Sequence, residues 1–137
     1  MDGKTLFLSS LAEVFAYPYN AADGTLGAKK VLIHNLKNGG LHSSRTMLTS
    51  QKVPGLLLVQ RGSDGNVDFD ANKTETGRSQ FRIFNITTLL SSASPVNFTT
   101  GELYGWGMRN SVGMAENPAN GGIVSSIPEK TKVCFVY

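Results

Sequence analysis

The chain has little cysteine, little charge and no long hydrophobic run. Its 137 residues include a single cysteine, Cys134, so no disulfide can form within the chain. Charged residues make up 17% of it, below the roughly 25% typical of soluble domains. The 13 Lys and Arg are dispersed and leave a net charge of only +3. A small, scattered positive excess argues against nucleic acid as a partner.

Long apolar segments are also missing. No run approaches the roughly 18 residues that a membrane helix needs, so we expect no membrane partner. The first four residues lack the basic and apolar segments of a signal peptide, which leaves a cytosolic chain or a leader outside this sequence. Three glycosylation sequons favour secretion, because such sites are modified only on the secretory route. They begin at Asn72, Asn85 and Asn97.

No long stretch keeps a helical period, and short alternating or apolar runs take its place. Turn formers such as Asp23-Gly24 separate these runs, which predicts β-strands and an all-β fold. Residues 86–101 are rich in Ser, Thr, Asn and Pro and predict a long loop. The predicted strands are 5–9, 13–19, 30–35, 45–48, 56–60, 80–85, 112–116, 123–126 and 132–136.

Glycines lead directly into apolar strands three times, at Gly3, Gly55 and Gly122. Their spacing exceeds the roughly 40 to 50 residues of a standard propeller blade, which is consistent with blades that carry insertions. An antiparallel sandwich in which glycines mark hairpins explains the same spacing equally well.

Three segments carry a more specific signal: VFAYPY at 14–19, LVQRGSDGN at 58–66 and GWGMRNSVGMAENP at 105–118. In this order the chain resembles the glucose/sorbosone dehydrogenase family, particularly its fungal quinone-dependent pyranose dehydrogenase-like members, over about residues 2–124. The resemblance implies a six-bladed β-propeller that binds pyrroloquinoline quinone (PQQ) and calcium and oxidises a sugar hydroxyl. This length would make a partial propeller of two to three blades, built from antiparallel four-stranded sheets.

The resemblance also implies two regions. Residues 1–124 are the predicted partial propeller, and residues 125–137 form a divergent tail in which 132–136 is a predicted edge strand. Relatives commonly continue from this point with an Asn-containing segment that helps to bind calcium, and the tail departs from that pattern. We therefore expect the chain to be a truncated fragment without the calcium site.

His42 is the candidate catalytic residue. Oxidation by hydride transfer needs a base beside the sugar hydroxyl, and a neutral imidazole suits that task. The resemblance places a catalytic histidine on a loop that faces the cofactor, and His42 lies in such a loop before a predicted strand. Many relatives have an acidic residue before this histidine, where Leu41 stands here. The alternative is a loop histidine without a special role.

Arg109 and Asn110 are the main candidate cofactor ligands. A guanidinium and an amide can donate hydrogen bonds to quinone oxygens and stabilise negative charge there, and the resemblance implies that role for this pair. The alternative is that the pair caps a tight turn made by Gly105, Gly107 and Gly113.

Three further residues are candidates for cofactor binding: Arg45, Arg61 and Asp64. Arg45 supports the His42 loop or reaches the cofactor, unless it is a solvated strand end. Arg61 and Asp64 flank Ser63, where Ser63-Asp64-Gly65-Asn66 predicts a β-turn. A calcium site at Asp64, Asp68 and Asp70 is conceivable, but a solvated acidic loop is favoured. The metal ligands therefore stay unknown.

Three functions remain open. The first is a PQQ-dependent sugar dehydrogenase domain that acts within a longer chain, with His42 as base and a sugar as substrate. The second is a non-catalytic secreted β-rich module that binds carbohydrate or protein and self-associates through exposed strand edges. The third is a defective product without an evolved function.

Overall fold

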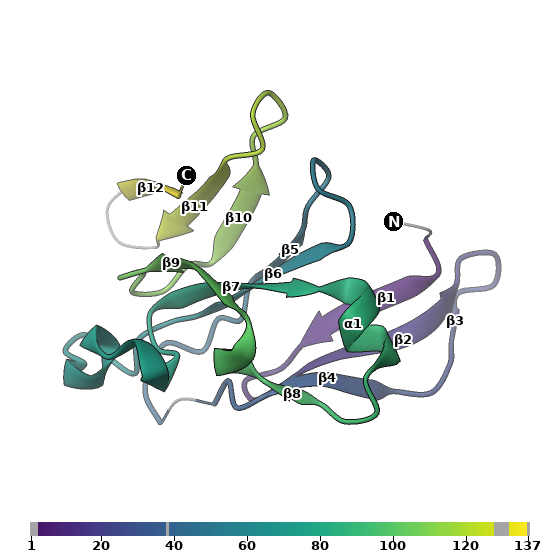
Figure 1. Ribbon diagram of the computed structural model, residues 1–137, viewed down its shortest axis with the longest axis horizontal. Coiled ribbons are helices and arrows are strands. Elements are labelled where there is room, and N and C mark those ends of the chain that lie inside the picture. The colour runs from purple at the N-terminus through teal and green to yellow at the C-terminus, as the bar shows by residue number, and fades with distance from the viewer. Residues whose placement is uncertain (1–2, 38, 128–131, 137) are drawn as a thin grey trace.

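Three β-sheets make up the fold, and the second lies between the other two (Figure 1). The computed structural model describes residues 3–37, 39–127 and 132–136. The predicted all-β fold is confirmed, with one short α-helix added. No helix among the described residues is long and apolar enough to span a membrane.

The first sheet follows the N-terminal strands. Its order is β1-β2-β4-β8, and β3 pairs with the end of β2. These pairs are antiparallel except for β4 and β8, which run parallel. Their bounds are Thr5–Ser9 (β1), Val14–Asn20 (β2), Thr25–Leu26 (β3), Lys30–His34 (β4) and Val96–Asn97 (β8).

The second sheet has four antiparallel strands in the order β5-β6-β7-β9. They are Met47–Thr49 (β5), Leu56–Arg61 (β6), Gln80–Asn85 (β7) and Glu102–Trp106 (β9). The third sheet has the order β10-β11-β12, with the bounds Gly113–Glu116, Ile123–Ile127 and Lys132–Val136. The predicted antiparallel sheets are confirmed, apart from the parallel pair of β4 and β8. The prediction of four strands in each sheet is wrong, because the sheets formed by the described residues have five, four and three strands.

The core lies between the first and second sheets. Alternate residues of β2 and β6 point into it, which is the two-residue period of a strand. Strand β6 is buried on both faces, because Leu58 and Gln60 are buried as well. Removing these side chains from water stabilises the fold by roughly 25 cal/mol per Å² of apolar surface. The buried members are Val14, Ala16, Leu32, Ile33, Leu36, Leu57, Val59, Phe84, Leu89 and Phe98.

The predicted long loop at 86–101 is wrong. The segment contains the helix α1 (Ile86–Ser91), the strand β8 and a 3₁₀-helix over Phe98–Thr100. Asn85 caps α1, since its side chain accepts a hydrogen bond from Thr88 N at 3.0 Å. Leu89 and Phe98 are buried. The burial of these two side chains in the core thus stabilises regular structure in a segment whose composition is typical of a loop.

Strand β9 was not predicted, because Gly101 and Gly105 interrupt its apolar pattern. Gly101 is required for packing: a Cβ added there would lie 2.4 Å from Phe84 Cζ. Gly105 lies within the strand, opposite Phe81. Strand β9 ends just before the Met108-Arg109-Asn110 segment, which it positions next to β6 and β7.

Candidate functional site

Gly62, directly after β6, is the point where the predicted site residues converge. A Cβ added to Gly62 would lie 2.7 Å from Arg109 O, 3.1 Å from His42 Cβ and 3.2 Å from Asn110 Oδ1. Only glycine fits at such distances. We call His42, Gly62, Ser63, Arg109 and Asn110 the Gly62 site.

His42 is held at this site by Ser63. The residue is 6% exposed, and its Nδ1 lies 2.8 Å from Ser63 Oγ and 3.1 Å from Ser63 O. The histidine belongs to the connection between β4 and β5, and Ser63 belongs to the connection after β6. The orientation of the imidazole therefore comes from a residue distant in sequence.

The loop before His42 is clamped by Asp64. Gly40 N donates to Asp64 Oδ1 at 2.6 Å, and Leu41 N donates to Asp64 O at 2.9 Å. A Cβ on Gly40 would lie 1.3 Å from Asp64 O, so this close approach also requires glycine. Leu41 itself is 79% exposed. Residues 63 and 64, and not residue 41, thus fix the histidine.

The guanidinium of Arg45 braces the surrounding backbone. It is buried, and burial together with the positive charge of Arg61 lowers its pKa to about 10, so it stays protonated at neutral pH. Its Nη2 has no hydrogen-bond partner among the described residues. A solvated strand end is excluded by this burial, while a cofactor contact stays a prediction. Nε and Nη1 donate, at 2.6 to 3.1 Å, to the carbonyl oxygens of Leu11, Leu36, His42 and Ser44.

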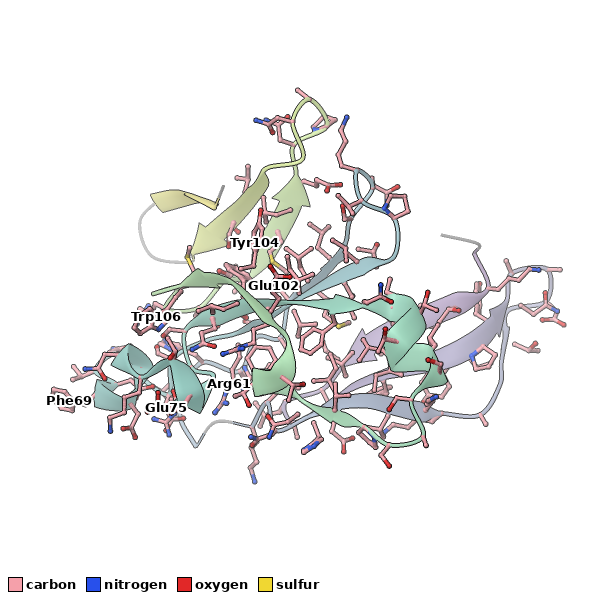
Figure 2. The ribbon with its side chains drawn as sticks, viewed as in Figure 1. Arg61, Phe69, Glu75, Glu102, Tyr104 and Trp106 are labelled. Atoms are coloured by element: carbon pink, nitrogen blue, oxygen red, sulfur yellow. The ribbon has the colours of Figure 1, made fainter. Side chains whose placement is uncertain are left out.

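Arg61, at the end of β6, has a similar arrangement (Figure 2). Its guanidinium donates to the carbonyl oxygens of Asn35 at 3.3 Å, Thr76 at 2.7 Å and Lys37 at 3.2 Å. Burial and the positive charge of Arg78 lower its pKa. The described bonds join the end of β6 to two connecting segments, the one after β4 and the one before β7. A role in cofactor binding stays a prediction.

The acidic loop of Asp64, Asp68 and Asp70 is neutralised by Arg78. Arg78 Nη1 lies 2.8 Å from Asp68 Oδ1, 3.8 Å from Asp64 Oδ2 and 3.7 Å from Asp70 Oδ2. The side chain of Asp68 is only 3% exposed, so this part of the loop is packed and not solvated. Among residues 3–37, 39–127 and 132–136, no cluster of three or more His, Cys, Asp or Glu could hold a metal ion.

Arg109 and Asn110 approach the site from the connection between β9 and β10. Arg109 Nη2 donates to Asn66 Oδ1. Asn110 Oδ1 is buried and has no hydrogen-bond partner within the described part of the chain. The proposed glycine turn is not formed as such, because Gly105 belongs to β9 and Gly113 to β10. Gly107 alone of the three has a positive φ, of 85°.

A shallow groove adjoins the Gly62 site on the side of β9. Trp106, at the end of that strand, donates from Nε1 to Ala71 O at 2.8 Å. It lies beside two short 3₁₀-helices, Phe69–Asn72 and Thr74–Thr76 (Figure 2). The groove has a volume of about 510 Å³, and its lining includes Ser63, Asn66, Asp68, Asn72, Trp106 and Arg109.

The Gly62 site fits a quinone cofactor in its chemistry. Arg109 and the amide nitrogen of Asn110 can donate to quinone oxygens, and the unpaired Asn110 Oδ1 can accept a hydrogen bond from a ligand. Sequence reasoning did not find the roles of Gly62 and Ser63. The turn signal at Ser63–Asn66 marked the segment, but nothing local in the sequence indicated that His42 and Arg109 meet there.

Known proteins of one kind match this chain. Residues 1–130 match the family model described as TrAA12-like. A PQQ-dependent sugar dehydrogenase of Hypocrea jecorina is 42% identical over 126 residues, which cover 90% of this chain and 29% of that protein. A PQQ-dependent pyranose dehydrogenase of Coprinopsis cinerea is 32% identical over 118 residues, covering 86% and 16%. The chain thus spans less than a third of either relative.

Solved structures agree with this match. The calcium structure of the Trichoderma reesei carbohydrate-active enzyme of family AA12 superposes with a TM-score of 0.85 at 42% identity, covering 90% of this chain and 31% of that one. The holo form of the pyranose dehydrogenase PQQ domain of Coprinopsis cinerea superposes with a TM-score of 0.82 at 32% identity, covering 90% and 30%. With a family model that matches almost its whole length, the chain belongs to the TrAA12-like family.

Proposed function

We propose that this chain provides the catalytic base and part of the cofactor site of a PQQ-dependent sugar dehydrogenase. The names of its relatives support this proposal. The observation that carries it is the convergence of His42, Arg109 and Asn110 around Gly62, where any side chain would push them apart.

His42 acts as the general base in this proposal. Bound PQQ supplies the acceptor for the hydride that leaves the sugar carbon. Removing the proton of the sugar hydroxyl makes that departure possible, and His42 Nε2 takes it. Arg109 and Asn110 hold the cofactor and stabilise negative charge at its oxygens. Arg45, Arg61 and Asp64 keep the surrounding loops in place.

The remaining features follow the same proposal. The three sheets are two to three blades of a β-propeller, and further blades of a longer protein would complete the site. Calcium is implied by the resemblance, and we assign none of the residues of this chain to it. We propose secretion, and the exposed side chains of Asn72 and Asn85 leave two sequons accessible to glycosylation.

Calorimetric titration of the purified chain with PQQ, with and without calcium, tests this function. We expect saturable binding that Arg109→Ala weakens about tenfold or more, since a hydrogen bond to a charged group contributes roughly 1.5–3 kcal/mol. Lys52→Ala is the matched control, because it removes an exposed positive charge from the turn between β5 and β6, at the opposite end of β6 from Gly62. No binding by any form would contradict the proposal.

A dye-linked assay of sugar oxidation distinguishes the proposed role of His42 in proton removal from a role in PQQ binding. His42→Ala should keep most of the PQQ affinity and lose sugar-dependent dye reduction, because its proposed task is proton removal. Dye reduction by His42→Ala at the rate of an active unchanged chain would show that another group is the base.

A further inference from the structure

Two oxygens of Ser63 contact one ring nitrogen of His42. In a neutral imidazole one ring nitrogen carries the proton and the other accepts one, and the surrounding hydrogen bonds decide which. Here two oxygens of one residue, Ser63 O at 3.1 Å and Ser63 Oγ at 2.8 Å, face the same nitrogen, Nδ1. A carbonyl oxygen can only accept a hydrogen bond. Nδ1 must therefore carry the proton to bond with it.

The Ser63 hydroxyl agrees with this assignment. Its Oγ lies 2.9 Å from Gly65 O and 3.2 Å from Arg109 O, both of which can only accept. The hydroxyl has a single proton, and pointing it at a carbonyl leaves an Oγ lone pair towards His42. In the opposite arrangement, with the hydroxyl donating to Nδ1, the Nδ1 lone pair would face the Ser63 carbonyl oxygen at 3.1 Å.

We propose that Ser63 is the positioning residue that fixes His42 with its proton on Nδ1 and its acceptor lone pair on Nε2. This rests on the proposed function, in which Nε2 takes the proton of the substrate. Ser63 also ties the two sides of the site together, because its backbone N–H donates to Arg109 O at 2.8 Å. One residue thereby orients the base and anchors the backbone of a cofactor ligand.

Ser63 takes the place of a local acidic partner. The resemblance implies an acidic residue immediately before the histidine, and here that position is the exposed Leu41. A neutral hydroxyl and a carbonyl orient the ring without adding a negative charge beside it. The two acceptor oxygens of Ser63 contact the same ring nitrogen, which favours one rotamer of the His42 ring.

Long-range ¹H–¹⁵N correlation spectra of the histidine side chains test the proposal without cofactor or sugar. The chain has two histidines, and His34→Gln assigns their signals. Spectra are recorded at mildly alkaline pH, where imidazoles are generally neutral. We expect His42 to show the Nδ1–H pattern. An Nε2–H pattern would overturn the proposal, whatever the result of the PQQ titration.

Variants at position 63 isolate the hydroxyl. Ser63→Ala should shift the Nδ1 resonance of His42 and populate the second tautomer, because the nearer of the two Ser63 oxygens is removed. Ser63→Thr should restore the pattern of the unchanged chain, and Ser43→Ala, which removes an exposed hydroxyl beside His42, should leave it unaltered. If Ser63→Ala gives the spectrum of the unchanged chain, the hydroxyl does not position His42. If Ser63→Ala does not fold, the Ser63→Thr spectrum alone decides, and an Nε2–H pattern there contradicts the proposal.

Discussion

Two glycines place the catalytic residues of the proposed site. Gly62 leaves room for His42 and the Arg109 backbone, while Gly40 leaves room for the Asp64 carbonyl. Neither contact involves a positive φ among the described backbone angles. The requirement is one of space, so even a methyl group is expected to displace the loops that meet there.

Gly40→Ala should destabilise the chain by roughly 1–3 kcal/mol, the usual result of overpacking. The added Cβ would meet Asp64 O at 1.3 Å, so the His42 loop must move away from β6. Gly39→Ala is the matched control, since its Cβ would meet Asp64 Oδ2 at an ordinary 3.6 Å. Urea denaturation of the two variants measures the difference. Equal free energies of unfolding would show that the clamp is not required.

Asp68 gives the loop a pH-dependent stability. Burial would raise its pKa, but the hydrogen bonds from Asp64 N and Arg78 outweigh burial and hold it below the ordinary value of 3.8. A carboxylate whose pKa falls on folding stabilises the fold above its unfolded pKa, and this contribution is lost as the pH falls through its folded pKa.

Asp68→Asn should therefore lower the free energy of unfolding near neutral pH. The loss should become smaller below pH 3.8, the ordinary pKa of an aspartate. Urea denaturation of both chains over a pH series measures the gap between them. A gap that stays constant as the pH falls would show that the charge of Asp68 does not stabilise the fold.

The sequence indicated which residues are candidates for the site better than it indicated which contacts they make. His42, Arg109 and Asn110 were candidates because of their segments, and the structure brings them together. Arg45 was expected to support the His42 loop or to reach the cofactor, and Arg61 to bind the cofactor. Their described bonds run to backbone carbonyls. The hydrogen bonds of a buried arginine depend on which loops pack around it. The residues next to it in the sequence do not indicate which loops these are.

At the scale of elements, α1 and the two short segments after it connect the first and second sheets. Strand β8 pairs in parallel with β4, and α1 packs Leu89 into the same core. The Asn85 side chain begins this segment by capping α1. A single cap thereby fixes how the chain leaves the second sheet and reaches the first.

Asn85→Ala should lower the free energy of unfolding by about 0.5–2 kcal/mol, the usual contribution of an N-cap. Asn85→Asp, which keeps an acceptor oxygen for Thr88 N, should retain most of that stability. Thermal denaturation of both variants, produced without glycosylation, measures the difference. Equal losses for Ala and Asp would contradict the role of the cap.

The strands that sequence patterns predicted are those with alternating or continuous apolar residues. Strands β1, β2, β6 and β7 lie within a residue of their expected bounds. Strand β9 was missed because glycines interrupt its apolar pattern, one of which, Gly101, is required for packing against Phe84. Helix α1 was missed because its Ser and Thr residues outweigh its few apolar ones in the local composition. Burial in three dimensions decides such segments, and local composition does not report it.

At the scale of the whole molecule, strand edges and apolar side chains are exposed. The edge strand β1 presents Leu6 and Leu8, which are 36% and 39% exposed, and the edge strand β9 presents Leu103. Unpaired edges with apolar residues favour pairing with another chain. We propose that the isolated chain self-associates through these edges.

Sedimentation velocity over a series of concentrations tests self-association. We expect the average mass to rise with concentration, and Leu8→Lys to reduce that rise because a lysine on an edge strand opposes pairing. Lys30→Ala, in the interior strand β4, serves as the control. A monomer at all concentrations would show that the exposed edges are protected in solution.

The proposed function depends above all on PQQ binding at the Gly62 site. The most direct measurement is a ¹H–¹⁵N titration of the labelled chain with PQQ, which reports the affected residues one by one. We predict shifts concentrated at His42, Gly62, Arg109 and Asn110, and their loss in Gly62→Ala. Shifts confined to residues remote from Gly62, or equal shifts in Gly62→Ala, would contradict the claim.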